Sequence, residues 1–241
     1  MKKIRSYCEL NIDGFAIRCP YFINKSKFNL WKNINFLGKG DSQGIIETAK
    51  TLIDKDKMPP EIKSSKSIRK YMKENNLGID CSGFVTRILD CWCREKYGKS
   101  LFRLVYIKLP FVKKIRYFFR PFENTSVEIL LHHMDKKMII KNSGDIRPGD
   151  LIHLGESHVL IVSQIFQDNN KLAREISYFH CSSRFDGVHQ GKINIINPNL
   201  ELGKQFWKEG SKEHNWTYQE YMRYHNSGVV RLKIFNENNN K

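Results

Sequence analysis

The stretch that most constrains the fold is residues 158–182, HVLIVSQIFQDNNKLAREISYFHCS. Its first nine residues are dominated by branched apolar side chains, a pattern typical of a β-strand buried on both faces. The polar segment 167–171 interrupts this run, and a second strand-like stretch follows it. If 167–171 is a hairpin loop, Phe166 pairs with Leu172. The sequence therefore predicts an antiparallel hairpin in the second half of the chain.

This register places His158 directly opposite His180. Directly opposed side chains share one face of the sheet, with Cβ atoms about 4.5–5.5 Å apart, so the two rings can form a hydrogen bond. One imidazole can then orient the other, as a general base and its orienting group require. A slip of one residue would send the two rings to opposite faces. The alternative is that both are structural, the role expected here for the other six histidines. Of these, His153 is expected on an adjacent strand, His132 and His133 in a helix, and His189, His214 and His225 in loops.

Helical patterns come before the strands along the chain. Helices are expected at 42–53, capped by Ser42, and at 61–74, and Pro59 and Pro60 separate these two segments. This order predicts an α+β protein with a mostly antiparallel sheet. Residues 1–60 are expected to be an N-terminal extension, and residues 61–241 the main domain. Further strands are expected as two short ones within 7–24 around a turn at Asp13 and Gly14, at 151–154, and at 228–235.

A cysteine begins the amphipathic pattern at 78–93, GIDCSGFVTRILDCWC. Apolar residues spaced three or four apart predict a helix with Cys81 in its first turn and Asp80 as its N-cap. The helix dipole favours a nearby anion by up to about 2 kcal/mol, so it lowers a thiol pKa of about 8.5 by about 1.5 units at most. A protonated imidazole is needed to lower the pKa further. Cys81 is thus a candidate nucleophile, and a buried structural thiol is the alternative.

The chain is strongly basic, with 41 lysines and arginines against 25 acidic residues and a formal charge of +16. Such a charge indicates an anionic partner or a solvated basic surface, and since no nucleic-acid-binding motif is present, no specific nucleic acid is expected. Residues 102–121 carry six basic side chains and no acidic one, among aromatic and aliphatic residues. This basic insertion is expected either to dock on an anionic membrane or polymer, to form a lid, or to pack an apolar face into the core. Pro110 and Pro121 argue against one uninterrupted helix.

Neither a signal peptide nor a membrane-spanning segment is expected. The basic start of the chain has no apolar run behind it, and no stretch approaches 18 apolar residues. A cytoplasmic location is the default expectation, with non-classical export as the alternative. Six irregularly spaced cysteines predict reduced thiols. The Cys91-x-Cys93 pair matches no zinc pattern, so neither a metal nor a cofactor is expected.

Four segments together carry a family resemblance: DCSGFV at 80–85, IRPGDLIHL at 146–154, SHVLIV at 157–162 and FHCSS at 179–183. Their order and context resemble the NlpC-type cysteine peptidases, a papain-like family best known for cleaving bacterial cell-wall peptides. The resemblance covers roughly residues 70–195. It implies a papain-like fold in which the helix bearing the nucleophile packs on the sheet.

The resemblance also implies roles for individual residues. Cys81 would be the nucleophile, His158 the general base and acid, and His180 the third polar residue of the triad. Asp80 and Ser82 would line the substrate site, where a free amine of the stem peptide is recognised. The family's proline-tyrosine-x-tryptophan-glycine-glycine stretch is absent before Cys81, which leaves the second oxyanion donor open, with Tyr71 as one substitute.

The implied function is hydrolysis, through an acyl-enzyme, of amide bonds in peptidoglycan-type peptides that contain γ-glutamyl or diaminopimelate units. The implied partner is a peptide or muropeptide substrate. Two alternatives stay open: an intracellular enzyme of the same fold that transfers the acyl group to an amine, and a non-catalytic basic binding module.

Overall fold

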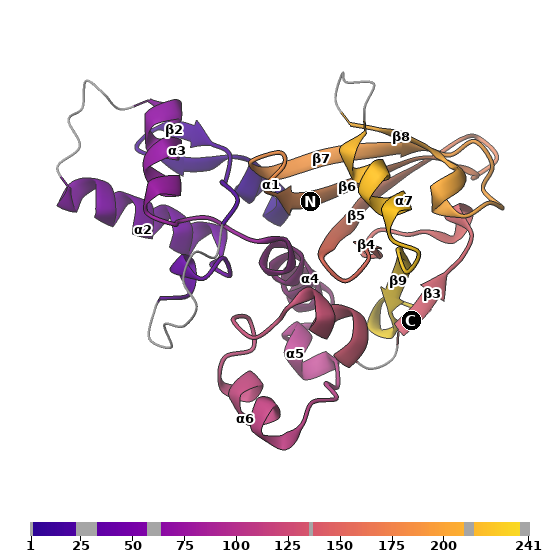
Figure 1. Ribbon diagram of the computed structural model, residues 1–241, viewed down its shortest axis with the longest axis horizontal. Helices are drawn as coiled ribbons and strands as arrows, with labels where there is room; N and C mark the ends of the chain where they lie inside the picture. Colours follow the sequence, from indigo (N-terminus) through magenta and orange to yellow (C-terminus); the bar gives the residue numbers. More distant parts are fainter. Residues whose placement is uncertain (1, 23–32, 57–63, 135–136, 210–214, 237–241) are drawn as a thin grey trace. The chain divides into compact units, whose positions relative to one another are not determined.

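The computed structural model describes residues 2–22, 33–56, 64–134, 137–209 and 215–236, and shows an α+β protein (Figure 1). The chain divides into two compact units. The first comprises Met1–Ile88 and Cys181–His189, and the second comprises Leu89–His180 and Gln190–Lys241. The expected division at residue 60 into extension and main domain stays a prediction, and Pro59 and Pro60 lie outside the described residues.

The first unit begins with helix α1 (Lys2–Cys8) and a two-stranded antiparallel hairpin, β1 (Leu10–Ile12) and β2 (Phe15–Ile17). Asp13 and Gly14 join the two strands with φ angles of 52° and 83°. Two consecutive positive φ angles fit the right-handed twist of a tight hairpin, and aspartate followed by glycine adopts them readily. The two short strands expected within 7–24 are therefore confirmed.

Two further helices belong to the first unit, and both differ from the expectation at their N-terminal ends. Helix α2 (Ser42–Lys55) is capped by Asp41, whose carboxylate accepts hydrogen bonds from the N–H groups of Gln43 and Gly44, so the expected Ser42 cap is wrong by one residue. Helix α3 (Ser65–Glu74) is capped by Ser64 in a capping box. The predicted start at residue 61 lies outside the described residues, and the described part of the helix begins at Ser65.

Helix α4 (Cys81–Tyr97) begins at the predicted residue and continues from the first unit into the second. Its predicted apolar face is confirmed, because Phe84, Val85, Ile88 and Leu89 are fully buried. Within the first unit, the ring of Phe84 packs edge-on against Tyr7 at a centroid distance of 5.5 Å. Cys81 is thus anchored at the start of a long helix whose first turns are held by core packing.

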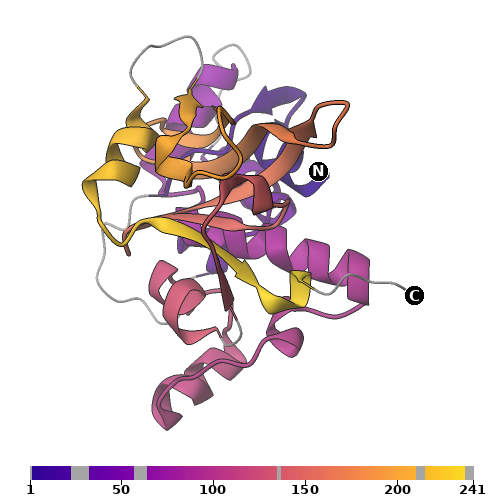
Figure 2. The same ribbon diagram turned by 90° about the vertical axis from the view of Figure 1, so that its right-hand side faces the viewer.

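A mostly antiparallel sheet of seven strands forms the second unit, in the order β3-β9-β4-β5-β6-β7-β8 (Figures 1 and 2). The predicted strands at 151–154, 158–166 and 172–182 are present with bounds within one residue of the expectation. The predicted strand at 228–235 ends at residue 232 and continues as a 3-10 turn. The strands are β3 (Lys137–Ile140), β4 (Leu151–Leu154), β5 (His158–Gln167), β6 (Ala173–Ser182), β7 (Gly187–Asn194), β8 (Phe206–Lys208) and β9 (Gly228–Leu232).

One face of this sheet carries the main core of the second unit. Buried side chains from most of its strands meet there, among them Ile152, Leu160, Tyr178 and Trp207. Helix α7 (Trp216–Arg223) contributes Tyr218 and Tyr221 to the edge of this core. Short helical turns complete the described chain at Ile34–Phe36, Ile129–His133, Ser143–Asp145, Leu202–Lys204 and Lys233–Phe235.

The basic insertion forms two helices of the second unit, α5 (Leu101–Leu104) and α6 (Phe111–Phe119). Pro110 is the N-cap of α6 and Pro121 follows its end, which confirms that the segment is not one uninterrupted helix. Both views place α6 at the end of this unit farthest from the sheet (Figures 1 and 2). Within the part of the chain that the structure describes, none of the helices combines the length and the apolar character needed to cross a membrane.

Candidate active site

Cys81 lies in the first turn of α4, next to a well-formed N-cap. The Asp80 carboxylate accepts a hydrogen bond from the Gly83 N–H at 2.6 Å, and the Asp80 carbonyl accepts one from Phe84 at 2.9 Å. The predicted cap is therefore confirmed. Cys81 is 7% exposed, whereas Cys19, Cys93 and Cys181 are completely buried. The Cys81 residue thus keeps a small accessible surface that these three cysteines lack.

Gly83 explains why the segment reads cysteine-serine-glycine. A Cβ atom at this position would lie 2.2 Å from the Gly38 carbonyl oxygen, so any larger residue would displace the backbone. The Asp80 N–H donates to the same carbonyl at 3.0 Å. The close approach holds the start of α4 against the loop that precedes α2.

That loop carries Lys39, a buried lysine that the sequence analysis missed. Its ammonium donates to Asp80 Oδ1 at 2.9 Å and to Ser82 Oγ at 2.5 Å, and its side chain is 8% exposed. The Arg87 guanidinium donates to the Lys39 carbonyl at 2.9 Å and fixes the loop from the next turn of α4. The two side chains expected to receive a substrate amine therefore already hold an amine of the protein. The only sequence signal was a lysine between two glycines, Gly38 and Gly40, which identifies no partner.

Tyr21 is a second residue near Cys81 that the sequence analysis did not select. It forms an isolated parallel bridge with Ile79, two residues before the cysteine. Burial raises the pKa of Tyr21 well above its ordinary value, and the negative charges of Cys81, Asp80 and Cys181 raise it further. Its hydroxyl therefore stays protonated and can donate a hydrogen bond close to the thiol. Tyr71, the substitute considered from the sequence, instead donates to the Leu52 carbonyl at 3.0 Å.

In the second unit, the two predicted histidines meet. His158 Nε2 and His180 Nδ1 are 2.8 Å apart, and their rings pack edge to face with centroids 5.1 Å apart. His180 is almost completely buried, and His158 is partly exposed at the start of β5. Since His158 Nε2 faces His180, a proton exchange with a thiol would use Nδ1.

The strand register that brings these rings together differs from the prediction. The structure pairs Ile161 with Phe179, so His158 and His180 are diagonal neighbours instead of directly opposed residues. The offset is two residues, which keeps both side chains on one face. From Gln164 to Phe166 the register is shifted by one further residue, with Phe166 opposite Glu175, and at Gln167 it shifts back. The expected pairing of Phe166 with Leu172 is therefore wrong, because the structure pairs Gln167 with Ala173.

A β-bulge at Ser163 connects the two registers. Val162 pairs with Tyr178 and Gln164 pairs with Ser177, so Ser163 is the extra residue on β5. Its hydroxyl donates to the Ser177 carbonyl at 3.0 Å, which stabilises the bulge. A second irregularity between Phe166 and Gln167 shifts the register by one residue in the opposite sense, so Gln167 and Ala173 pair in the same register as Ile161 and Phe179. With that irregularity kept, a β5 strand without Ser163 would place His158 and His180 on opposite faces. The bulge at Ser163 therefore offsets the second irregularity and keeps the histidine pair on one face.

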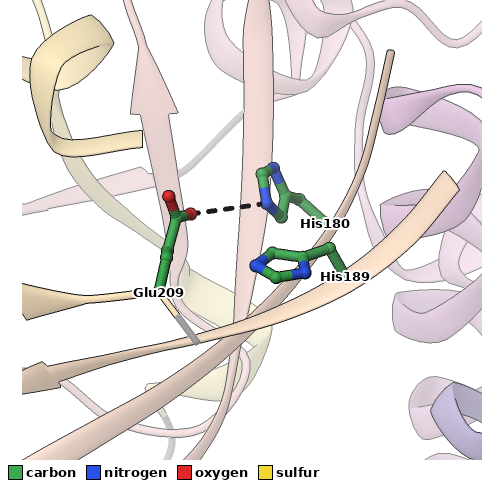
Figure 3. A group of neighbouring side chains, drawn as sticks. All are labelled: His180, His189 and Glu209. Atoms are coloured by element: carbon green, nitrogen blue, oxygen red, sulfur yellow. Dashed lines mark ion pairs between the residues drawn. The ribbon is translucent and has the colours of Figure 1, made fainter. Parts of the chain in front are cut away.

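Glu209 lies beside His180, and its carboxylate faces the Nε2 atom of the ring (Figure 3). Its carboxylate lies 3.9 Å from His180 Nε2, and both side chains are 2% exposed. Glu209 accepts hydrogen bonds from the Tyr178 hydroxyl at 2.9 Å and from the Thr217 N–H at 3.2 Å, and also from the Thr217 hydroxyl. Burial raises the pKa of Tyr178 well above its ordinary value, and the Glu209 charge adds to the effect, so the phenol remains a donor. A buried carboxylate held in this way favours a positive charge on the adjacent imidazole.

Burial makes most of the other thiols poor nucleophiles. It raises the pKa of Cys8 to about 11 and of Cys93 to about 12, and it raises the pKa values of Cys19 and Cys181 still further. Cys181 donates to the Ile79 carbonyl at 3.1 Å, so it supports the segment that leads into Cys81.

The remaining histidines occupy varied positions. His153 lies on β4 and its Nδ1 is 3.0 Å from the Gly155 carbonyl. His132 and His133 lie in a helical turn, as expected, and pair with Glu156 and Glu128. His189 lies on β7, so its expected loop position is wrong, whereas His225 lies in a turn and His214 lies outside the described residues.

The predicted site residues thus form two groups. Asp80, Cys81 and Ser82 gather in the first unit, and His158 and His180 are hydrogen-bonded in the second. The meeting of Cys81 with His158 stays a prediction. Comparisons with known protein families, with curated proteins and with solved structures find no match.

Proposed function

We propose that this protein is a cysteine hydrolase with a papain-like fold that cleaves amide bonds of peptidoglycan-type peptides. The observation that carries the proposal is the hydrogen bond between His158 Nε2 and His180 Nδ1, 2.8 Å long and aligned by a β-bulge. A base that must exchange a proton with a thiol needs a partner that fixes its tautomer and stabilises its cation. His180 fixes the tautomer of His158, and His180 together with the buried Glu209 beside it stabilises the cation.

The reaction proceeds in two steps. His158 takes the proton of the Cys81 thiol through Nδ1, and the thiolate attacks the carbonyl carbon of the scissile amide. The C–N bond breaks as His158 returns the proton to the leaving amine, which leaves a thioester on Cys81. His158 then removes a proton from water, the hydroxide attacks the thioester, and the acid product departs as the thiol regains its proton.

Two hydrogen-bond donors of the first unit suit the oxyanion. The Cys81 N–H lies at the positive end of helix α4, where a developing negative charge is favoured. The Tyr21 hydroxyl, kept protonated by burial and nearby negative charges, is the second donor. Tyr21 thereby fills the role that the sequence had left open.

The position of Lys39 narrows the substrate class. A free amine on the substrate would have to displace an ammonium that already bonds Asp80 and Ser82 at 2.9 and 2.5 Å. We therefore favour γ-glutamyl or isopeptide bonds inside longer peptides, where the amine is blocked. A substrate carboxylate near Lys39 would gain from its charge.

The decisive experiment measures the rate of Cys81 alkylation against pH in the wild type, in His158→Ala and in His153→Ala. Mass spectrometry of the Cys81 peptide separates it from the other thiols. We expect the wild type and the His153→Ala control to react well below pH 8, and His158→Ala to react as an ordinary thiol with a pKa of about 8.5. A wild-type titration like that of an ordinary thiol would support the non-catalytic binding module and overturn the proposal.

A panel of stem peptides identifies the reaction. Turnover should disappear in Cys81→Ala and persist in Cys8→Ala, since Cys8 lies on α1 and the mechanism does not use its thiol. Acylated peptides should be better substrates than peptides with a free amine. A product that forms only when an acceptor amine is added would assign the acyl-transferring alternative, and turnover that survives Cys81→Ala would exclude the assigned nucleophile.

A further inference from the structure

Helix α6 exposes an apolar face instead of burying it. Phe111, Val112, Phe118 and Phe119 are each 75–79% exposed, and Ile115 is 46% exposed. At about 100° per residue, these five side chains lie within an arc of about 120° on one side of the helix. Most amphipathic helices of globular proteins turn such a face toward the core, so an exposed one indicates a binding surface.

The opposite side of α6 holds the helix in place. Tyr117 is 6% exposed, and its ring packs edge-on against Phe102 at a centroid distance of 5.7 Å. Its hydroxyl is 3.1 Å from the Thr125 hydroxyl. The helix is therefore fixed in one rotation, with the five apolar side chains directed outward.

Basic side chains flank the exposed apolar face on both sides. On the helical wheel, Lys114 lies about 40° beyond one edge of the arc and Arg116 about 40° beyond the other. Lys113 lies farther round, and Arg120, at the C-cap, pairs with Glu123 at 3.0 Å. No acidic residue occurs within 102–121.

The same mixture of chemistry lines a cavity of about 520 Å³ between α5 and α6. Aromatic rings such as Phe102, Tyr106 and Phe118 share its lining with the cationic side chains of Arg103 and Lys114. An amphipathic anion suits such a lining better than a purely apolar or a purely charged ligand does.

We propose that α6 lies in the interface of an anionic lipid bilayer, with its five exposed apolar side chains among the acyl chains and its lysines and arginines at the headgroups. Charge complementarity favours this occupant, because each lysine or arginine close to an anionic leaflet adds to the attraction for it. A second copy of the chain would bring like charges together on both sides of the contact. An anionic membrane supplies an apolar layer for the exposed apolar side chains and negative charge for the lysines and arginines beside them.

Vesicle sedimentation tests the proposal without any use of catalysis. The full chain should bind vesicles of phosphatidylcholine and phosphatidylserine at least tenfold more strongly than vesicles of phosphatidylcholine alone, and added salt should weaken the binding. The double variant Phe118→Ser/Phe119→Ser should lose most of this binding. Ile139→Ser is the matched control, because Ile139 is 76% exposed on β3 of the same unit and should leave binding unchanged.

A second measurement reports on insertion directly. The fluorescence of Phe118→Trp should shift to shorter wavelength when phosphatidylserine vesicles are added, as an indole does on entering an apolar layer. Equal sedimentation of the wild type and the double serine variant, or no shift of the introduced tryptophan, would overturn the proposal. So would a concentration-dependent dimer that the double variant abolishes, since a second copy would then be the occupant.

Discussion

The buried pair of Lys39 and Asp80 predicts a large loss of stability when only one of its charges is removed. Lys39→Met keeps most of the side-chain volume and leaves the Asp80 carboxylate without its ammonium. Asp80 retains the Gly83 N–H at 2.6 Å and the Ser82 hydroxyl at 3.1 Å, and its side chain is 23% exposed. Because breaking a fully buried pair costs about 3–5 kcal/mol, we expect a loss near the lower bound, about 3 kcal/mol.

Urea unfolding followed by circular dichroism measures this loss. Asp80→Asn and the double variant Lys39→Met/Asp80→Asn complete a double-mutant cycle. Each single variant leaves one charged group of the pair without its partner, whereas the double variant removes both charged groups. The double variant should therefore lose about 1–2 kcal/mol less than the sum of the single losses.

Lys73→Met provides the matched control. Lys73 pairs with Asp186 at 3.1 Å in the same unit, but its side chain is 44% exposed. Exposed pairs contribute at most about 1 kcal/mol, so this variant should lose much less than Lys39→Met. Equal losses for Lys39→Met and Lys73→Met, or a cycle in which the single losses simply add, would refute the buried ion pair at the start of α4.

Three further variants test other buried groups. Glu209→Gln should lower kcat/KM about tenfold, the equivalent of about 1.4 kcal/mol, and move the basic limb of the pH–rate profile to lower pH, because the imidazolium at His180 loses a stabilising charge. Burial lowers the pKa of His189 from its ordinary 6.5 to about 4, so between these values the unfolded chain binds a proton that the folded chain does not, and stability falls as pH falls. Thermal melts across this window should show a smaller decrease for His189→Phe than for the wild type. Arg231→Met should cost about 3–5 kcal/mol in urea unfolding, because it leaves the buried Asp150 carboxylate without its bidentate partner.

The sequence predicted the features that depend on local patterns. The start of helix α4 at Cys81 and its Asp80 cap could be predicted because the apolar spacing and the capping residue lie within one short stretch of sequence. The Asp13–Gly14 hairpin follows from the φ angles that these residues tolerate. The cap of α2 was assigned one residue too late because Asp41 and Ser42 are adjacent and both can cap, and only the Asp41 side chain accepts from the N–H groups of Gln43 and Gly44.

The partners that complete the site depend on contacts between distant parts of the chain. Lys39 reaches Asp80 across 41 positions, and nothing near Lys39 in the sequence distinguishes it from the other lysines. Glu209 lies on no recognisable motif, and it directly follows β8, a short strand that periodicity did not reveal. Tyr21 reaches the Cys81 segment through a single bridge to Ile79. Residues of this kind emerge only from tertiary structure.

The histidine pair requires both residues to lie on one face of the sheet. Any register offset of an even number of residues meets this requirement. An even offset moves His180 from a directly opposed to a diagonal position on the same face, and two imidazole rings still span that separation at 2.8 Å. An odd offset, such as the one that holds from Gln164 to Phe166, would abolish the contact. Ser163 converts this odd offset into an even one by adding a single residue to β5. Ser163 and Gln164 interrupt the apolar run of the strand, but a polar pair of this kind does not by itself indicate a bulge. The Ser163 hydroxyl, which donates to the Ser177 carbonyl, shows why a serine suits that position.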